Sequence, residues 1–187
     1  MKKVILISGL VVALGAVVAI LVGYKFTKSN NQRLEEGVYY EERNLHIAVS
    51  YNRPFKKGRQ IFGALVPYGK TWRTGANEPT TLETNKDITI GGKILKKGRY
   101  SLWTVPNETS WQVVFNSSVP NWGVDVMKNG QAARDEKTDA LVIEVPVMQT
   151  EKEFEQFTIR IEKADDALEL VLAWDKTLVV VPFVVNE

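Results

Sequence analysis

The hydrophobic positions of the chain follow two different patterns, and the first is one continuous apolar run. It extends from Val4 to Tyr24 without a charged residue and is preceded by a methionine and two lysines. As a helix, this run would be about 31 Å long, which matches a bilayer core of about 30 Å. We therefore predict that residues 1–25 form an N-terminal transmembrane anchor, in which residues 4–24 contact the lipid bilayer.

A cleavable signal peptide is the alternative, because lysines followed by an apolar run are typical of both. The run is longer than the roughly 7–15 residues of a signal-peptide core, and no A-x-A site precedes Lys25, so an uncleaved anchor is favoured. A short N-terminus usually leaves the C-terminal domain on the exported side. The prediction is a single-pass membrane protein with an extracytoplasmic, periplasmic domain.

Small residues recur at every fourth position within the apolar run, at Gly15, Ala19 and Gly23. This spacing lets a second helix backbone approach closely, so the three residues are a candidate helix-packing stripe toward another membrane protein. The alternative is that they have no partner, since small residues are common in membrane helices.

The second pattern begins after a polar linker at residues 26–36 and predicts strands throughout residues 37–187. Apolar residues alternate with other residues from Leu45 to Tyr51, and Gly91-Gly92 separates two short apolar runs as in a tight hairpin. Further β-branched and aromatic runs occupy residues 100–105, 111–116, 141–147, 154–162, 168–174 and 177–185. The expected fold is an all-β domain, an antiparallel β-sandwich, in which only residues 124–137 form a short helix or an irregular loop.

The amino-acid composition of the chain limits the kinds of chemistry that it can perform. The chain has no cysteine and one histidine, which excludes thiolate chemistry and disfavours a zinc site, so we expect neither a metal nor a cofactor. Twelve basic and three acidic residues lie in residues 43–99, against seven and fifteen in residues 100–187. We expect these halves to neutralise each other inside one domain, and we expect no nucleic-acid partner.

A dense block of Gly, Pro, Arg and aromatic residues follows the first predicted strand. It comprises Tyr51-Asn-Arg-Pro54, Lys57-Gly-Arg59, Ile61-Phe-Gly63, Leu65-Val-Pro-Tyr-Gly69 and Trp72-Arg-Thr-Gly-Ala-Asn77. With Gly98-Arg-Tyr-Ser101, Trp111 and Trp122-Gly123 further on, the chain resembles the bacterial domain-of-unknown-function family DUF2911.

The resemblance implies an exported protein, which agrees with the predicted anchor, but it implies no activity. Members of the family commonly carry a tyrosine shortly after the Trp-Gly pair. In this chain Val124 and Asp125 follow that pair, so a site that depends on the tyrosine would be altered.

The best candidate for a ligand or partner surface is a cationic and aromatic set drawn from the same block. Its members are Tyr51, Arg53, Arg59, Trp72, Arg73 and Asn77. Arginine binds carboxylate or phosphate with two parallel hydrogen bonds, and tryptophan and tyrosine stack on sugars or cations. In the alternative, structural interpretation, Glu78 or Glu83 holds one or two of these arginines and Asn77 bonds the backbone in a turn.

A complete catalytic group is not evident. His46 and Ser50 share a strand face about 13 Å apart, too far for a hydrogen bond, and no G-x-S-x-G elbow is present. The segment from Gly63 to Thr71 has five residues between its glycines, whereas a phosphate-binding loop requires four.

We therefore expect a membrane-anchored binding or accessory module without enzymatic activity. One alternative is a cell-envelope hydrolase that uses His46 or a carboxylate pair from Glu78, Glu83 and Asp87. The other is a subunit of a larger membrane protein complex.

Overall fold

The computed structural model describes residues 35–42, 44–165 and 167–186. The predicted anchor and the stripe of Gly15, Ala19 and Gly23 lie outside these residues, as does most of the predicted linker. Within the described part, no helix is long and apolar enough to cross a membrane.

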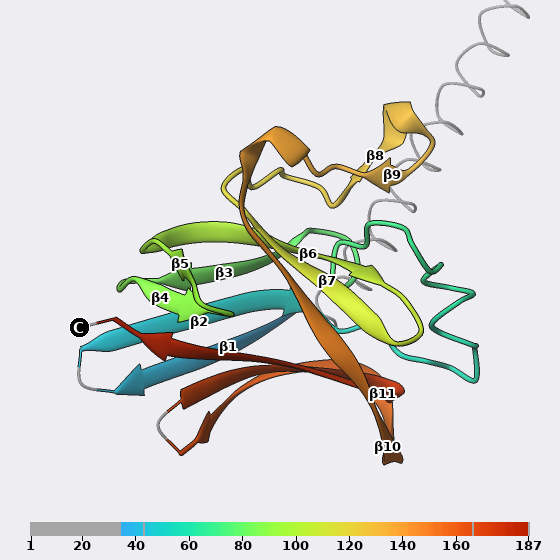
Figure 1. Ribbon diagram of the computed structural model, residues 1–187. Coiled ribbons are helices and arrows are strands. Elements are labelled where there is room, and N and C mark those ends of the chain that lie inside the picture. The colour runs from blue at the N-terminus through green and yellow to red at the C-terminus, as the bar shows by residue number, and fades with distance from the viewer. Residues whose placement is uncertain (1–34, 43, 166, 187) are drawn as a thin grey trace, which may run out of the picture. The chain divides into compact units, whose positions relative to one another are not determined.

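Antiparallel strands build the domain (Figure 1). They are β1 (Glu35–Glu42), β2 (Leu45–Asn52), β3 (Thr80–Thr84), β4 (Ile88–Ile90), β5 (Lys93–Leu95), β6 (Gly98–Pro106), β7 (Ser110–Asn116), β8 (Val124–Asp125), β9 (Gln131–Ala132), β10 (Asp139–Ala164) and β11 (Ala167–Val185). Nine of them form one sheet in the order β1-β2-β3-β6-β7-β10-β11-β4-β5, and β8 pairs with β9 alone. The predicted all-β antiparallel class is confirmed.

Local patterns explain several of these strands. In β2 the residues Leu45, Ile47, Val49 and Tyr51 are buried, as their alternation predicts. The β4–β5 hairpin turns at Gly91 and Gly92, whose φ angles of 55° and 75° suit the tight primed turn that two glycines favour. Residues 124–137 form the β8–β9 ribbon and two single 3₁₀ turns, η1 (Val126–Lys128) and η2 (Glu136–Thr138), so no α-helix forms there.

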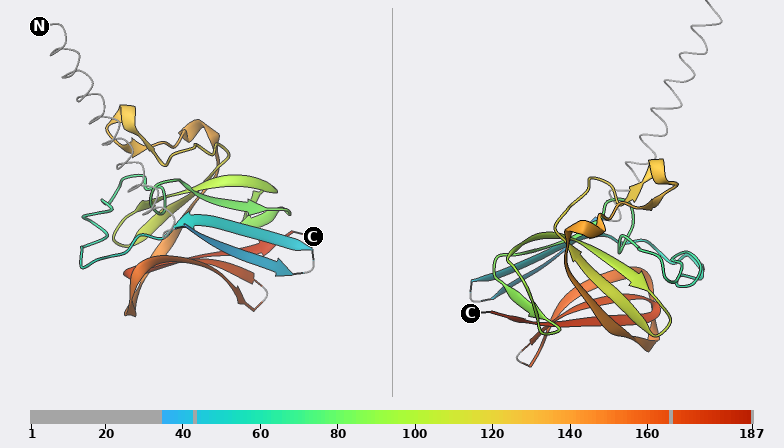
Figure 2. Two further views of the ribbon diagram at one scale, coloured as in Figure 1. Left: turned by 180° about the vertical axis from the view of Figure 1, so that it is seen from behind. Right: turned by 45° about the horizontal axis from the view of Figure 1, so that its top comes forward.

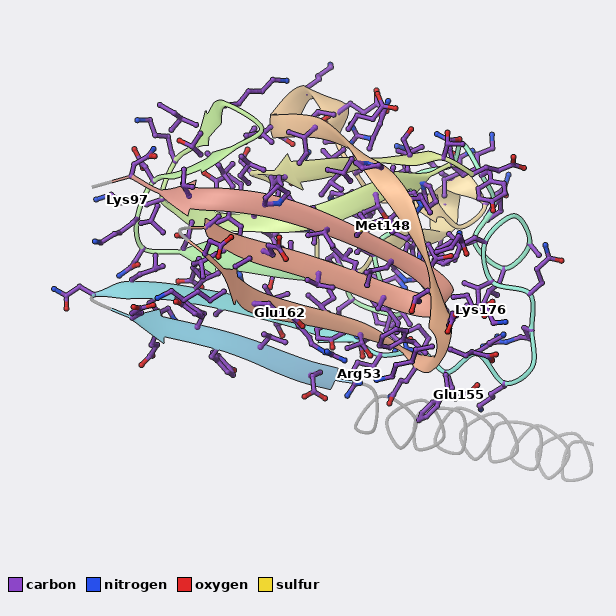
Figure 3. The ribbon with its side chains drawn as sticks, turned by 60° about the horizontal axis from the view of Figure 1, so that its bottom comes forward. Arg53, Lys97, Met148, Glu155, Glu162 and Lys176 are labelled. Atoms are coloured by element: carbon purple, nitrogen blue, oxygen red, sulfur yellow. The ribbon has the colours of Figure 1, made fainter. Side chains whose placement is uncertain are left out.

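The predicted runs at 141–147 and 154–162 belong to the single strand β10, and those at 168–174 and 177–185 belong to β11. Both strands fold back on themselves (Figures 1 and 3). In β11 the reversal coincides with Asp175 in the left-handed conformation, at φ 56°. In β10 the pairing register with β11 shifts between Gln149 and Phe154 and again before Thr158.

This reversal gives the domain two layers that enclose the core. Figure 2 shows the layer of β1, β2, β3, β6 and β7 facing the layer that contains β11. From β11, the buried side chains of Leu170, Leu172, Val179 and Val181 point into this core. The intervening residues of β11 therefore lie on the opposite, outer face of the strand.

An aromatic cluster fills one end of the core. Trp72 stacks on Trp174 with ring centroids 5.9 Å apart and an interplanar angle of 18°. Phe157 meets Trp72 edge-on at 5.0 Å, and Trp111 lies 6.2 Å from Trp72. Because Trp72 lies in the long segment between β2 and β3, this cluster fastens that segment to β10 and β11.

Truncating Phe157 tests the cluster. Its ring is fully buried between Tyr51 and Trp72, so Phe157→Ala should lower the free energy of unfolding by about 3–5 kcal/mol. Urea denaturation followed by near-ultraviolet circular dichroism measures the loss. Val184→Ala, at a side chain 44% exposed on β11, is the control and should change it by less than about 0.5 kcal/mol. Equal effects of the two substitutions would contradict the assigned core.

Candidate functional site

The six residues of the predicted cationic and aromatic surface differ in burial and in their hydrogen bonds. Tyr51 is buried at the end of β2. Its hydroxyl accepts a hydrogen bond from the backbone N–H of Ile159 at 2.9 Å and donates one to the carbonyl of Ile159 at 3.4 Å. Burial raises the pKa of Tyr51. This tyrosine therefore fastens β2 to β10.

Arg53 directly follows β2 and joins β10 to β1. Its Nε donates to the carbonyl of Phe157 at 3.2 Å, and its Nη2 donates to Thr158 Oγ1 at 3.2 Å. Its Nη1 pairs with Glu36 Oε2 at 3.0 Å. Each of the three guanidinium nitrogens has an acceptor, as the structural interpretation proposed, although the carboxylate comes from Glu36 and not from Glu78 or Glu83.

Arg59 and Trp72 also bond within the domain. Arg59 donates to the carbonyls of Phe55 and Lys56 in its own loop. The indole N–H of Trp72 donates to the carbonyl of Gly75 at 3.0 Å, and its ring belongs to the aromatic cluster.

Arg73 and Asn77 differ from the others because each carries a buried side-chain nitrogen without a hydrogen-bond partner, Nε in Arg73 and Nδ2 in Asn77. Burial lowers the pKa of Arg73, and the nearby charge of Glu78 partly opposes this effect. The backbone between them is unusual, since Thr74 and Asn77 both have positive φ angles, 56° and 59°. A β-branched residue in this region indicates local strain.

Gly123 covers this pair. Its N–H donates to the carbonyl of Asn77 at 3.1 Å. A Cβ at Gly123 would lie 2.3 Å from Arg73 Cδ and 2.8 Å from the carbonyl oxygen of Asn77. Gly123 therefore packs directly against the aliphatic part of Arg73 and the backbone of Asn77. The predicted surface is not assembled as one open site, and a binding role for its members stays a prediction.

The predicted charge matching occurs at Lys56. Its Nζ pairs with Glu153 Oε1 at 2.8 Å and with Asp175 Oδ1 at 2.7 Å, which joins the basic part of the sequence to the acidic part. These bonds raise the pKa of Lys56, the contact to Asp175 most strongly.

A groove of about 820 Å³ lies on the outer face of β10 and β11. Figure 3 views this face, with Met148, Glu162 and Lys176 labelled. Its lining comprises Gly91, Ile143, Glu144, Val145, Pro146, Met148, Phe154, Thr158, Arg160, Glu162, Glu169, Val171, Ala173, Leu178, Val180 and Pro182. We call this feature the β10–β11 groove.

The two ends of the β10–β11 groove differ in polarity. Met148 and Leu178 pair across the strands near the reversal, and Met148 is 41% exposed. Further from the reversal, Glu162 stands directly opposite Glu169 in the β10–β11 register. The apolar end and the acidic end are joined by a floor that includes Val171.

One basic side chain lines the groove between these ends. Arg160 Nη1 lies 3.3 Å from Glu162 Oε1, and its guanidinium lies 5.9 Å from the ring centroid of Phe154. In the described part of the chain, no basic side chain forms an ion pair with Glu169. Two carboxylates directly opposite each other on a sheet repel, so one cation leaves this end with an excess of negative charge.

Three residues of the hydrolase alternative contact other groups of the described domain. His46 Nδ1 lies 3.0 Å from Glu41 Oε1 on the exposed side of β2. Glu78 accepts a hydrogen bond from Asn52, and Asp87 accepts from Lys96 and from the backbone N–H of Lys97, which lowers the pKa of Asp87.

In the described residues, no group of three or more His, Cys, Asp and Glu side chains could hold a metal ion.

The covering of Arg73 and Asn77 can be tested at Gly123. Gly123→Ala should lower the free energy of unfolding by about 1–3 kcal/mol, because the added methyl group collides with Arg73 and the Asn77 backbone. Thermal unfolding gives the readout, with Asn121→Ala at an exposed neighbouring position as the control. A Gly123→Ala variant as stable as the parent protein would show that the segment is not packed as described.

Comparison with known proteins identifies a family. A family model described as "Protein of unknown function (DUF2911)" matches residues 34–183. No curated protein and no solved structure matches the chain significantly. The match spans all nine strands of the large sheet in whole or in part and includes the β10–β11 groove. The chain belongs to the DUF2911 family.

Proposed function

We propose that the domain is a binding module without enzymatic activity, and that it holds an apolar ligand in the β10–β11 groove. The observation that carries this proposal is that the groove on the outer face of β10 and β11 is lined mainly by apolar side chains. A volume of about 820 Å³ falls within the roughly 300–1,000 Å³ typical of small-molecule sites.

The details of the groove support a ligand site. Val171 and Ala173 on its floor are 8% and 3% exposed, although they lie on the outer face of β11. The walls rise from both halves of β10, with Met148 on one side and Phe154 on the other. An antiparallel sheet commonly turns polar side chains toward water on its outer face, so an apolar and recessed outer face indicates a partner or ligand.

The scaffold is suited to binding. We infer a β-sandwich arrangement for the folded sheet, in which the groove residues lie on long paired strands and their backbones are held by the β10–β11 ladder. Sites built on strands hold their geometry better than sites on loops. By contrast, the single histidine of the hydrolase alternative pairs with Glu41 on the exposed side of β2 and lines neither wall nor floor of the β10–β11 groove.

A photoactivatable alkyl alcohol tests the ligand site. The full chain, reconstituted in zwitterionic phospholipid nanodiscs, should be labelled at β10 and β11, with mass spectrometry locating the modified residues. Val180 is a half-buried residue of the groove lining, so Val180→Lys places a charge in the groove. This substitution should reduce the labelling about tenfold.

The matched control is Val184→Lys, the same change on the same strand at an exposed position outside the groove lining. It should leave the labelling unchanged. Thermal unfolding of both variants confirms that the fold survives. Labelling of Val180→Lys at the parental level would refute the groove as the binding site.

We also propose that residues 4–24 anchor the module in a membrane, with the domain outside the cytoplasm. The length of the uncharged run supports this, and the family match begins only at residue 34. Intact-mass analysis of the native protein should find residues 1–25 attached, and protease added to spheroplasts should digest the domain. A new N-terminus just after Tyr24 would instead indicate a cleaved signal peptide.

A further inference from the structure

The charges around the β10–β11 groove are arranged along its length, and this arrangement restricts what the groove can hold. The floor from Ala173 toward the reversal is apolar, with Leu178 and Met148 beside it. At the other end the side chains of Glu162 and Glu169 face each other across paired strands. A ligand that lies along the groove therefore meets hydrocarbon at one end and carboxylates at the other.

The carboxylate end requires a positive charge. Directly opposed side chains on antiparallel strands have Cβ atoms about 4.5–5.5 Å apart, so two glutamates at this distance repel. Arg160 offsets Glu162 at 3.3 Å, and in the described part of the chain it is the sole basic lining residue of the groove. Glu169 is half-buried, so water screens its charge less than it would on an open surface.

The apolar part has a defined length. Glu169 and Ala173 are four residues apart on β11, which corresponds to about 13 Å at roughly 3.3 Å per residue. The lining residues of the second half of β11, Leu178 to Pro182, run over an equal number of positions. The groove thus offers room for one short hydrocarbon chain with its head group beside Glu169.

From this geometry we infer that the ligand is a single-chain cationic amphiphile. Its alkyl chain lies over Val171 and Ala173 with its end toward Met148 and Leu178, and its positively charged head group sits between Glu162 and Glu169. The inference rests on the proposed function, since it assigns a ligand class to the same groove. Anionic amphiphiles are disfavoured, because their head group would meet the two carboxylates.

Three photoactivatable probes with the same decyl chain test the assignment: a trimethylammonium, a sulfate and the neutral alcohol. The full chain in zwitterionic nanodiscs is labelled with each below its micellar concentration, and the modified residues are located by mass spectrometry. The ammonium probe should label the groove about tenfold more than the alcohol, and the sulfate less than either. The preference for the ammonium probe should fall as salt is raised, because ions screen the carboxylates.

Glu169→Gln keeps the shape of the side chain and removes its charge. This variant should lose most of the preference for the ammonium probe, roughly tenfold, while labelling by the neutral alcohol persists. Glu83→Gln, at the exposed position of β3, removes the same net charge away from the groove and is the matched control. It should keep the full preference.

The outcomes separate the inference from the proposed function. Groove labelling by all three probes without a charge preference overturns the cationic ligand and leaves the binding module intact. Absence of groove labelling by any probe overturns both. An ammonium preference that Glu169→Gln does not reduce places the head group elsewhere and overturns the assignment. Competition by a basic, apolar peptide that exceeds the unlabelled ammonium compound would overturn it in favour of a protein partner.

Discussion

The reversal of β10 and β11 is the constraint on which the rest of this domain depends. By folding back, β11 presents Leu172 to the core with its first half and Val181 with its second. The same reversal brings Trp174 into stacking contact with Trp72. Because Trp72 belongs to the long segment between β2 and β3, this contact holds the segment over one end of the core. Lys56 reinforces this closure, because it pairs with Asp175 at the reversal itself.

β11 carries apolar side chains on both of its faces, and the two faces have different surroundings. On the inner face of β11, hydrophobic burial stabilises the fold, as the nearly complete burial of Leu170 and Leu172 shows. On the outer face, Val171 and Ala173 do not contribute to that core, yet they are also shielded by the walls of the groove. The apolar surface that stays accessible in the groove lies on Met148, Leu178 and Val180, and a ligand that covers it gains hydrophobic free energy.

Much of the fold could be predicted from local sequence pattern. The alternation in β2 and the glycine pair between β4 and β5 have short-range physical causes, namely one buried face and two positive φ angles, and both appear as expected. The joining of two predicted runs into β10, and of two more into β11, could not be read in this way. It depends on the pairing register, which is a long-range property.

The site was harder to predict for a related reason. Arginine and tryptophan types suggest ligand chemistry, but whether Arg53 is open or bonded depends on Glu36 and Thr158, which are distant in sequence. The residues 169–173 did carry a readable signal, since Val171 and Ala173 are apolar where strict alternation would place polar side chains. A groove can be inferred from these two residues only when the reversal of the two strands is known.

The open edge of the sheet has a further consequence for behaviour in concentrated solution. β1 ends the order of strands, so one side of its backbone lacks a ladder partner within the sheet. Charged side chains lie along it, including Glu36, which pairs with Arg53, and Glu42, which pairs with Lys163. A second copy that met this edge would have to desolvate these charged side chains, which opposes the growth of a continuous intermolecular sheet.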